Sequence, residues 1–280
     1  MEIEIKSMDE MIKDLIESFD KKDSYYPSLD EKTWVYEAGT ITLLTGRTSQ
    51  AKTCLTLNLI IEQLINNPES VCLYLACDGI GSTERNWLVS ITASKLNINR
   101  EEAIDTLSQW ISTHRLILLP NENKSVYRKL KEITSTIEHY KLRYGITHFF
   151  IDDMKSIESG SDIEDLDTET KRVMSELKTL IRKLELPLIL VCPGNDYLLE
   201  DETAMLNLQS QINPETYLDD LLYCFSLYMY SRIILGVELL KTREQKSCNM
   251  LIHILKDNNR PSGTSVNLKF TGELALVSEY

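Results

Sequence analysis

The side chains best suited to chemistry in this sequence are a lysine and a threonine that follow a run of small polar residues. The stretch TGRTSQAKT, residues 45–53, comes directly after the apolar run 41–44. It approximates a phosphate-binding loop, in which one glycine, four residues and a second glycine precede Lys and Ser or Thr. In such a loop Lys52 would reach the outer phosphates of a nucleotide, and the Thr53 hydroxyl would bind magnesium. The sequence therefore predicts a site for ATP or ADP with Mg²⁺.

The backbone of this loop is expected to hold the phosphates, because the N–H groups at the start of the following helix point toward them. The residues that we assign to nucleotide binding are Gly46, Arg47, Thr48, Ser49, Gln50, Ala51, Lys52 and Thr53. Ala51 stands where the pattern has its second glycine. A methyl group there crowds the ligand, or costs about 1–2 kcal/mol if the position needs a left-handed backbone. An ordinary strand-to-helix turn remains the alternative.

The elements that must hold this loop in place are predicted from apolar runs that alternate with helical patterns. Strands are expected at 40–45, 70–77, 115–119, 146–152 and 186–192. Helices are expected between them, at 52–65, 83–96, 101–113, 124–143 and 168–185. Continuous apolar strands separated by helices indicate a parallel sheet that is buried on both faces.

The two ends of the chain differ in character from this alternating region. Near the C-terminus, short turns such as RPSG join runs that predict antiparallel strands, at 221–230, 247–256, 265–270 and 273–278. At the N-terminus, residues 7–19 predict an amphipathic helix with a Ser7–Glu10 capping box. It packs either on its own domain or across a neighbouring subunit. We expect a helical arm and linker over residues 1–27 and one α/β domain over residues 28–280.

Composition and charge narrow the possible classes of protein. The 280 residues are 42% hydrophobic and 26% charged, as is ordinary for a globular protein. No apolar run approaches the roughly 20 residues that span a bilayer, and the acidic start does not resemble a signal peptide, so we expect a cytoplasmic protein. The six cysteines and four histidines are scattered without zinc-ligand spacing. The net charge of −13 repels polyanions unless a basic face is set apart from the rest.

Several longer stretches together resemble the ATPase domain of the DnaB family of replicative helicases, which belongs to the RecA-fold group. The similar stretches are SLDEKTWVYEAGTITLLTGRTSQAKTCLTLNLI, CLYLACDGIGSTERNWL, HFFIDDMKSI, LELPLILVCPGND and HILKDNNRPSGTSVNLKF. They lie within residues 28–280. The resemblance implies a RecA-like three-layer α/β fold with a mainly parallel central sheet, antiparallel C-terminal strands and an N-terminal helical arm.

The resemblance also implies roles for two carboxylates. Asp152, at the end of the run HFFID, matches the aspartate that helps to position magnesium, although an aspartate there is also typical of a turn. Asp78 falls where the family has its catalytic glutamate, so its carboxylate would activate the attacking water. Aspartate is one methylene shorter than glutamate. We expect slower turnover, because a general base must come within hydrogen-bond reach of the water.

Elsewhere the chain departs from the family pattern. Pro193 replaces the glutamine that senses the γ-phosphate, and a proline cannot donate a hydrogen bond. The family points a Lys-x-Arg finger into the next subunit's site; here Lys256 survives, but Asn258 takes the place of the arginine. Arg260, two residues on, could substitute if the hairpin is shifted. Without a substitute the loss would be severe, because an arginine finger contributes about 10³–10⁵ in rate in other nucleotide hydrolases.

The segments that line the DNA channel in ring helicases of this type carry no positive charge here. The first, residues 158–170, holds six acidic residues and no basic one. The second lies within residues 184–231, which contain eight acidic residues and neither Lys nor Arg. Acidic runs are often only solvated surface, yet binding of single strands depends on cations that neutralise phosphates. We expect DNA binding through a central pore to be weak or absent.

Together these features predict a diverged DnaB-like protein that binds ATP, hydrolyses it weakly at most, and has an accessory or regulatory role in DNA replication or repair. It would act through protein contacts, as a homo-oligomer or in a mixed assembly with a replicative helicase or its loader. Two alternatives remain: a functional, strand-translocating helicase with unusual loops, and a RecA-fold regulatory ATPase that does not act on DNA. A scaffold with an inactive pocket is a further alternative.

Overall fold

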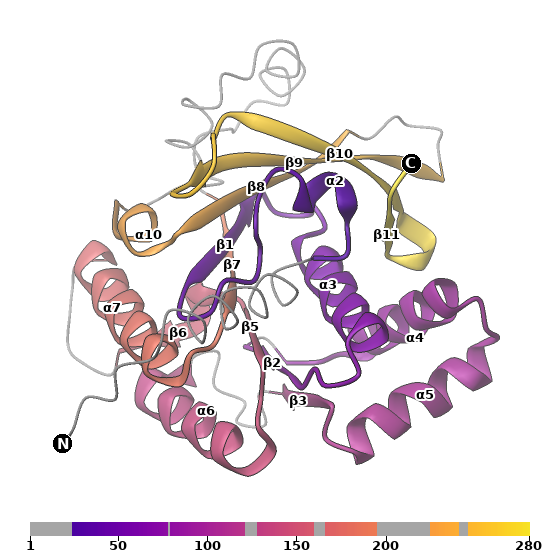
Figure 1. The fold of residues 1–280 in the computed structure, drawn as a ribbon, viewed down its shortest axis with the longest axis horizontal. Coiled ribbons are helices and arrows are strands. Elements are labelled where there is room, and N and C mark those ends of the chain that lie inside the picture. The colour runs from indigo at the N-terminus through magenta and orange to yellow at the C-terminus, as the bar shows by residue number, and fades with distance from the viewer. Residues whose placement is uncertain (1–23, 78, 121–127, 160–165, 195–224, 241–245) are drawn as a thin grey trace, which may run out of the picture.

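The structure is a computed structural model that describes residues 24–77, 79–120, 128–159, 166–194, 225–240 and 246–280. The helix predicted over residues 7–19 and the predicted catalytic residue Asp78 lie outside the described residues. One large sheet runs through the molecule, with helices on both of its faces (Figure 1). No helix in the part of the chain that the structure describes is long and apolar enough to cross a membrane.

The large sheet has nine strands in the order β11-β10-β9-β8-β1-β7-β5-β2-β3. Its parallel part consists of β1 (Ile41–Gly46), β2 (Cys72–Ala76), β3 (Leu116–Pro120), β5 (His148–Asp152) and β7 (Leu188–Pro193). Its antiparallel part consists of β8 (Ile233–Leu240), β9 (Ser247–Asp257), β10 (Thr264–Thr271) and β11 (Leu276–Ser278). β8 joins the two parts, because it runs parallel to β1 and antiparallel to β9. A separate two-stranded ladder pairs β4 (Arg128–Lys129) with β6 (Ile157–Glu158).

The helices divide between the two faces of the sheet (Figure 1). The face shown at the right carries α3 (Lys52–Asn66), α4 (Ser82–Leu96) and α5 (Arg100–Ser112). The face at the left carries α6 (Leu130–Tyr144), α7 (Leu166–Leu184) and α10 (Phe225–Tyr230). Shorter helical turns are α2 (Pro27–Asp30), η1 (Met154–Ser156) and η3 (Gly272–Leu274). These three layers form the RecA-like α/β fold.

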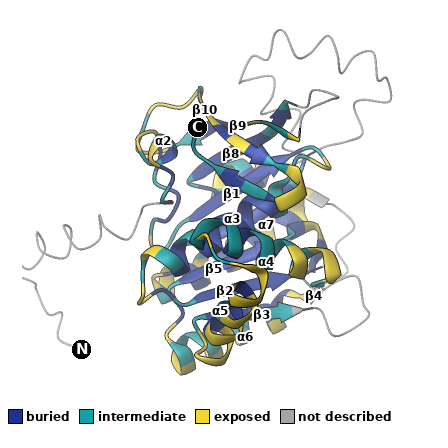
Figure 2. Cartoon of the chain, turned by 90° about the vertical axis from the view of Figure 1, so that its right-hand side faces the viewer, coloured by how far each residue is buried: buried dark blue, intermediate teal, exposed yellow. Residues whose placement is uncertain are grey.

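The central strands supply side chains to two apolar cores, because successive residues of a strand point to opposite faces of the sheet. On β1, Leu43 belongs to the core beneath α6 and α7, whereas Leu44 belongs to the core beneath α3. On β5, Phe149 and Phe150 divide in the same way. The strands are therefore buried on both sides, while exposed residues gather on the outer faces of the helices (Figure 2).

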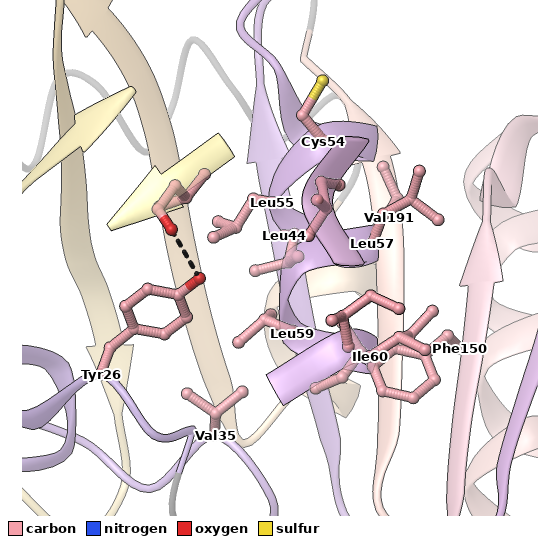
Figure 3. Packing of buried hydrophobic residues seen from close by; sticks show 14 of the residues in the cluster. Tyr26, Val35, Leu44, Cys54, Leu55, Leu57, Leu59, Ile60, Phe150 and Val191 are labelled. Carbon is pink, nitrogen blue, oxygen red and sulfur yellow. Dashed lines mark hydrogen bonds between the residues drawn. The ribbon is translucent and has the colours of Figure 1, made fainter. Parts of the chain in front are cut away.

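The helix α3, which follows the phosphate loop, is buried along most of its length. Its apolar side chains lie against β1, β5 and β7; those labelled on the helix in Figure 3 include Leu55, Leu57, Leu59 and Ile60. One buried polar residue in this helix is Asn58, whose Nδ2 donates to the carbonyl of Ala275 at 2.7 Å. Its Oδ1 accepts from the N–H of Val277 at 3.0 Å. These bonds tie α3 to β11, which fixes the helix that carries the loop.

The segment before β1 is also fastened to the C-terminal strand. The Tyr26 hydroxyl donates to the carbonyl of Val277 at 3.2 Å, the bond drawn as a dashed line in Figure 3. The Lys95 ammonium donates to the Tyr26 hydroxyl at 3.1 Å, to a Glu62 oxygen and to the Val277 carbonyl. The division of the chain at residue 27 between arm and domain stays a prediction.

One predicted element is wrong. The run 221–230 predicts a strand, but its described part, Phe225–Tyr230, is the helix α10. Leu227 is buried against the α7 side of the sheet while Phe225 and Met229 are exposed, as on one short helical turn. Periodicity alone does not distinguish a short apolar strand from a buried helical segment. The strand that joins the two parts of the sheet is β8, which no predicted element covers.

The other elements predicted within the described residues agree with the observed ones, apart from where two of them begin. α6 begins at Leu130 instead of residue 124, because residues 128–129 pair with β6. β11 begins at Leu276 because residues 272–274 form a helical turn. The alternation of strand and helix over residues 40–192 is confirmed.

His148 gives the fold a predictable response to acid. Its buried ring on β5 lies edge-on to the ring of Tyr36, with 4.9 Å between the ring centroids. Burial, and then the charge of Lys141, lowers the pKa of His148 from 6.5 to about 4. Between those two pH values the unfolded chain binds a proton on this ring that the folded chain does not. The free energy of unfolding therefore falls as the pH drops from 6.5 toward 4.

We expect His148 to account for a loss of about 2–3 kcal/mol in the free energy of unfolding between pH 7 and 4.5. Chemical denaturation of the wild type and of His148→Gln at both pH values measures this. The variant should lose less on acidification by about that amount. His139→Gln, at an exposed position, is the control and should behave like the wild type. Equal losses in wild type and His148→Gln would contradict the prediction.

Candidate nucleotide-binding site

The predicted phosphate loop lies at the carboxyl ends of the parallel strands. Residues 47–51 connect β1 to α3. Gly46, which ends β1, pairs with Pro193 of β7, and the N–H of Gly194 donates to the Gly46 carbonyl at 2.9 Å. Asp152 ends β5, the next strand along the sheet. The loop and the ends of its neighbouring strands therefore meet at the edge where open α/β sheets bind their ligands.

Gly46 occupies a position that requires glycine. Its φ is 151°, a value that residues with a side chain rarely adopt. A Cβ atom there would lie 2.5 Å from the carbonyl oxygen of Val237 on β8. The first glycine of the loop is therefore required by the close approach of the adjacent strand.

Ala51 occupies the second glycine position with a left-handed backbone. It is the N-cap of α3, with φ 59° and ψ 30°. Ser49 also has a positive φ, 63°. An L-residue in this region costs about 1–2 kcal/mol, whereas glycine enters it freely. The backbone is thus the one for which the phosphate-loop pattern uses glycine, and Ala51 adopts it under strain.

Lys52 is the first residue of α3, and its side chain contacts the loop. Its ammonium donates to the carbonyls of Gly46 at 2.7 Å and Arg47 at 2.8 Å. The side chain is half-buried. A cation held against the loop in this way can attract the phosphates of a nucleotide, because the carbonyl oxygens that accept its hydrogen bonds carry no formal charge.

The other predicted loop residues differ in exposure. Thr48 and Ser49 are exposed, whereas Arg47 and Gln50 are half-buried. The Gln50 side-chain oxygen accepts from the N–H of Leu239 at 2.5 Å, which ties the loop to β8. The tip of the loop therefore faces solvent while its second half is fixed to the sheet.

A threonine, an aspartate and a tyrosine meet beside the loop. The Thr53 side chain hydrogen bonds to the Asp152 carboxylate, and the Tyr74 hydroxyl donates to Asp152 Oδ2 at 3.3 Å. Burial is the largest effect on the pKa of Asp152 and, with the charge of Asp153, raises it to about 6. The bond from Thr53, the bond from Tyr74 and the charge of Lys52 oppose that rise.

These groups fit magnesium bound together with a nucleotide. Mg²⁺ takes oxygen ligands, and protein sites usually offer it one or two carboxylates beside substrate phosphates and waters. The Thr53 hydroxyl and the Asp152 carboxylate would hold it directly or through water. When bound, the ion supplies positive charge next to the phosphates, and it would also offset the burial of the carboxylate.

The residue predicted to activate water, Asp78, lies outside the described residues. The N–H of the preceding residue, Cys77, donates to the Asp152 carbonyl at 2.6 Å, so Cys77 lies beside the aspartate predicted to bind magnesium. Pro193 is half-buried and pairs with Gly46. The position that the resemblance assigns to a phosphate-sensing glutamine therefore lies next to the loop and lacks a donor.

Lys256 is not brought to the phosphate loop of its own chain. It pairs with Ile234, near the start of β8, whereas the loop follows the other end of β1. Its ammonium donates to the carbonyls of Tyr228 at 2.6 Å and Ser231 at 2.8 Å. Burial, and then the charge of Lys178, lowers the pKa of Lys256. A role in a neighbouring subunit's site stays a prediction.

Arg260 also lies away from the loop. Its guanidinium donates to the carbonyls of Asp30 at 2.9 Å and Glu31 at 2.8 Å. It also lies over the ring of Trp34, with 4.4 Å from Cζ to the ring centroid. The arginine predicted to replace a missing finger thus holds the segment before β1 in this chain.

The sequence does not single out Tyr74 as a site residue. It lies in the apolar run CLYLA, where a tyrosine is an ordinary core residue. Its role depends on register: Tyr74 pairs with Phe150, two residues before Asp152, so its ring extends along β5 to the carboxylate. Such a contact between strands that are far apart in the chain gives no local sequence signal.

Replacing Ala51 by glycine should relieve the strain in the loop. We expect Ala51→Gly to change the free energy of unfolding by between zero and about +1 kcal/mol, because the relief is partly offset by a more flexible unfolded chain. The control is Ala93→Gly inside α4, which should lower it by about 1 kcal/mol. Urea denaturation measures both. Equal destabilisation by the two changes would show that Ala51 is not strained.

Comparisons with known proteins place this chain in a family. A model of the DnaB-like helicase C terminal domain matches residues 23–193, which is more than half of the chain. No curated protein matches the chain in sequence. A solved structure of an ATPase domain covers 99% of this chain and 100% of its own, with 16% identity and a TM-score of 0.74.

Two further solved structures share the fold. A DnaB-like replicative helicase, solved to show its interactions with primase, has 16% identity and a TM-score of 0.73, covering 99% of this chain and 68% of its own. The RadB recombinase has 18% identity and a TM-score of 0.58, covering 92% of this chain and 99% of its own. At these identities the structures establish the RecA-like fold, and the family model establishes the family. The chain belongs to the family of DnaB-like helicase C-terminal domains.

Proposed function

We propose that this chain is a diverged DnaB-like protein that binds Mg²⁺-ATP, hydrolyses it weakly and acts in DNA replication or repair through contacts with other proteins. The observation that carries the proposal is the meeting of Lys52, Thr53 and Asp152 beside one loop at the carboxyl ends of the parallel strands. An ammonium, a hydroxyl and a carboxylate in this arrangement suit a triphosphate with magnesium. Membership of the DnaB-like family supports the same ligand.

Weak turnover is proposed because several groups that speed hydrolysis are altered. Ala51 strains the loop, and Pro193 offers no donor beside it. Asp78 provides a shorter side chain than glutamate for activating water, and Asn258 stands where a finger arginine would be. The changes at Asp78, Pro193 and Asn258 act on the transition state more than on binding, because positioned donors and bases matter most when charge develops. Ala51 instead weakens binding, through crowding or strain in the loop. Nucleotide binding can thus persist while hydrolysis slows.

The arginine finger is the most consequential of these changes. If Arg260 supplied the missing guanidinium to a neighbouring subunit, it would have to leave the carbonyls of Asp30 and Glu31 and the ring of Trp34. Lys256 would likewise have to leave the carbonyls at the end of α10. The contacts within one chain therefore favour slow turnover in the proposed assembly.

Protein contacts, and not a grip on DNA, are proposed as the mode of action. The net charge is −13, and residues 184–231 contain neither Lys nor Arg. Binding of single strands depends on cations along the path of the backbone. A similarly folded DnaB-like replicative helicase has been solved with its interactions with primase, which supports a replication context. We propose a homo-oligomer or a mixed assembly with a replicative helicase or its loader.

Removing the Lys52 ammonium tests the nucleotide site. Lys52→Ala should weaken ATP binding in the presence of Mg²⁺ at least tenfold, because a charge-assisted contact to phosphate contributes about 1.5–3 kcal/mol. Isothermal titration calorimetry measures the affinity. The control is Lys131→Ala, at an exposed position of α6, which should bind ATP like the wild type. If wild type and Lys52→Ala bind ATP equally, or neither binds it, the proposed function is wrong.

A further inference from the structure

We propose that Tyr74 is a positioning residue, whose hydroxyl holds the Asp152 carboxylate in the orientation in which it meets bound magnesium. The inference rests on the proposed nucleotide-binding function and deepens it. It adds a residue from β2 to a site otherwise built from β1, the phosphate loop, α3 and β5.

The first support for this role is the rigidity of the tyrosine. The side chain of Tyr74 is 1% exposed and belongs to the core beneath α3. The same core contains Cys54 and Ala76, and Tyr74 pairs with Phe150 between β2 and β5. An aromatic ring packed in a close-packed interior has one arrangement, so its hydroxyl is a fixed point. A fixed donor restricts the rotation of the carboxylate that accepts its hydrogen bond.

The second support is the direction from which the hydroxyl approaches. Tyr74 is buried, whereas Thr53 and Asp152 are half-buried at the edge of the site. Tyr74 therefore reaches Oδ2 of Asp152 from the core, at 3.3 Å. Thr53 contacts the same carboxylate from the start of α3. With one oxygen held from the core, the carboxylate keeps its face toward the loop whether or not magnesium is bound.

A second buried tyrosine, Tyr36, shows how a tyrosine hydroxyl in the core is hydrogen-bonded when it does not contact the site. Tyr36 is 2% exposed and its hydroxyl donates to the backbone carbonyl of Leu59 at 3.4 Å. Its hydroxyl is satisfied by the backbone, as a buried polar group requires. Tyr74 instead uses a carboxylate at the site. Tyr36→Phe is therefore a matched control for Tyr74→Phe, because both changes remove one buried hydroxyl and keep the ring.

The expected effect is confined to the part of the affinity that depends on magnesium. Without the hydroxyl, the Asp152 carboxylate loses a neutral donor and the orientation that this donor imposes. The bond is longer than the 2.7–2.8 Å typical of O–H···O pairs, so we expect a loss of about three- to tenfold. Contacts of the phosphates with Lys52 and the loop backbone do not involve Tyr74 and should be unchanged.

The experiment measures the affinity of the full chain for ADP in Mg²⁺ and in EDTA, for wild type, Tyr74→Phe and Tyr36→Phe. Tyr74→Phe should bind ADP about three- to tenfold more weakly in Mg²⁺ and like the wild type in EDTA. The Mg²⁺ concentration that half-saturates the effect should rise by a similar factor. Tyr36→Phe should match the wild type in both buffers.

The outcomes separate this inference from the function on which it rests. If wild type binds ADP more tightly with Mg²⁺ and Tyr74→Phe keeps the whole of that gain, the positioning role is overturned and the nucleotide site stands. Equal weakening by Tyr74→Phe in both buffers also overturns it, since a structural role alone would produce that result. If wild type binds no ADP in either buffer, both proposals fail.

A double-mutant cycle keeps the test valid if one variant is unstable. In the Asp152→Asn background, Tyr74→Phe should have no further effect on ADP affinity in Mg²⁺, because its contact has already lost its charge. Independent, additive effects would overturn the proposal. If Tyr74→Phe alone fails to fold, thermal unfolding of the Tyr74→Phe/Asp152→Asn double variant is measured instead. A double variant that folds supports the contact between the two side chains. A double variant that still fails to fold overturns the proposal.

Discussion

The half-buried carboxylate of Asp152 is the constraint on which the site depends. Burial disfavours the charged form of a carboxyl group and raises its pKa, here to about 6. The carboxylate tolerates this cost of desolvation only because partners stabilise its charged form. The partners come from two elements: Thr53 and the charge of Lys52 from the start of α3, and Tyr74 from β2. The order of the parallel strands and the placement of α3 are what bring them to one carboxylate. A bound cation would complete the same balance.

The part of the site that sequence could predict is the part that is local in the chain. Strand, loop and helix over residues 40–65 follow one another directly, so the positions of Gly46, Lys52 and Thr53 could be predicted from spacing alone. The left-handed backbone of Ala51 could be stated as a condition of the pattern, and the structure meets it. The expected parallel sheet followed from strands that are apolar on both faces.

The parts that sequence could not predict depend on contacts between distant segments. Tyr74 reaches Asp152 through the pairing of β2 with β5, 78 positions apart in the chain. The run at Phe225–Tyr230 fits a strand by its composition and becomes a helix because Leu227 packs on the α7 side of the sheet. Arg260 contacts the carbonyls of Asp30 and Glu31 and the ring of Trp34, and no local sequence signal indicates these contacts. Tertiary packing decided each of these. A role for Arg260 in a neighbouring subunit's site stays a prediction.

These features are consistent with a protein that still binds a nucleotide but hydrolyses ATP slowly. The groups proposed to hold phosphate and magnesium are present and mutually supported, whereas groups expected to act on the transition state are replaced or engaged elsewhere. The contacts of Arg260 also link the hairpin after β9 to the segment before β1. An assembly that used this hairpin in a neighbour's site would have to release that segment first.

The most direct test of this account is the steady-state rate of ATP hydrolysis by the wild-type chain, with and without single-stranded DNA at moderate salt. We expect slow turnover that DNA does not stimulate. Rapid turnover that rises with DNA would contradict it and would establish a working helicase motor.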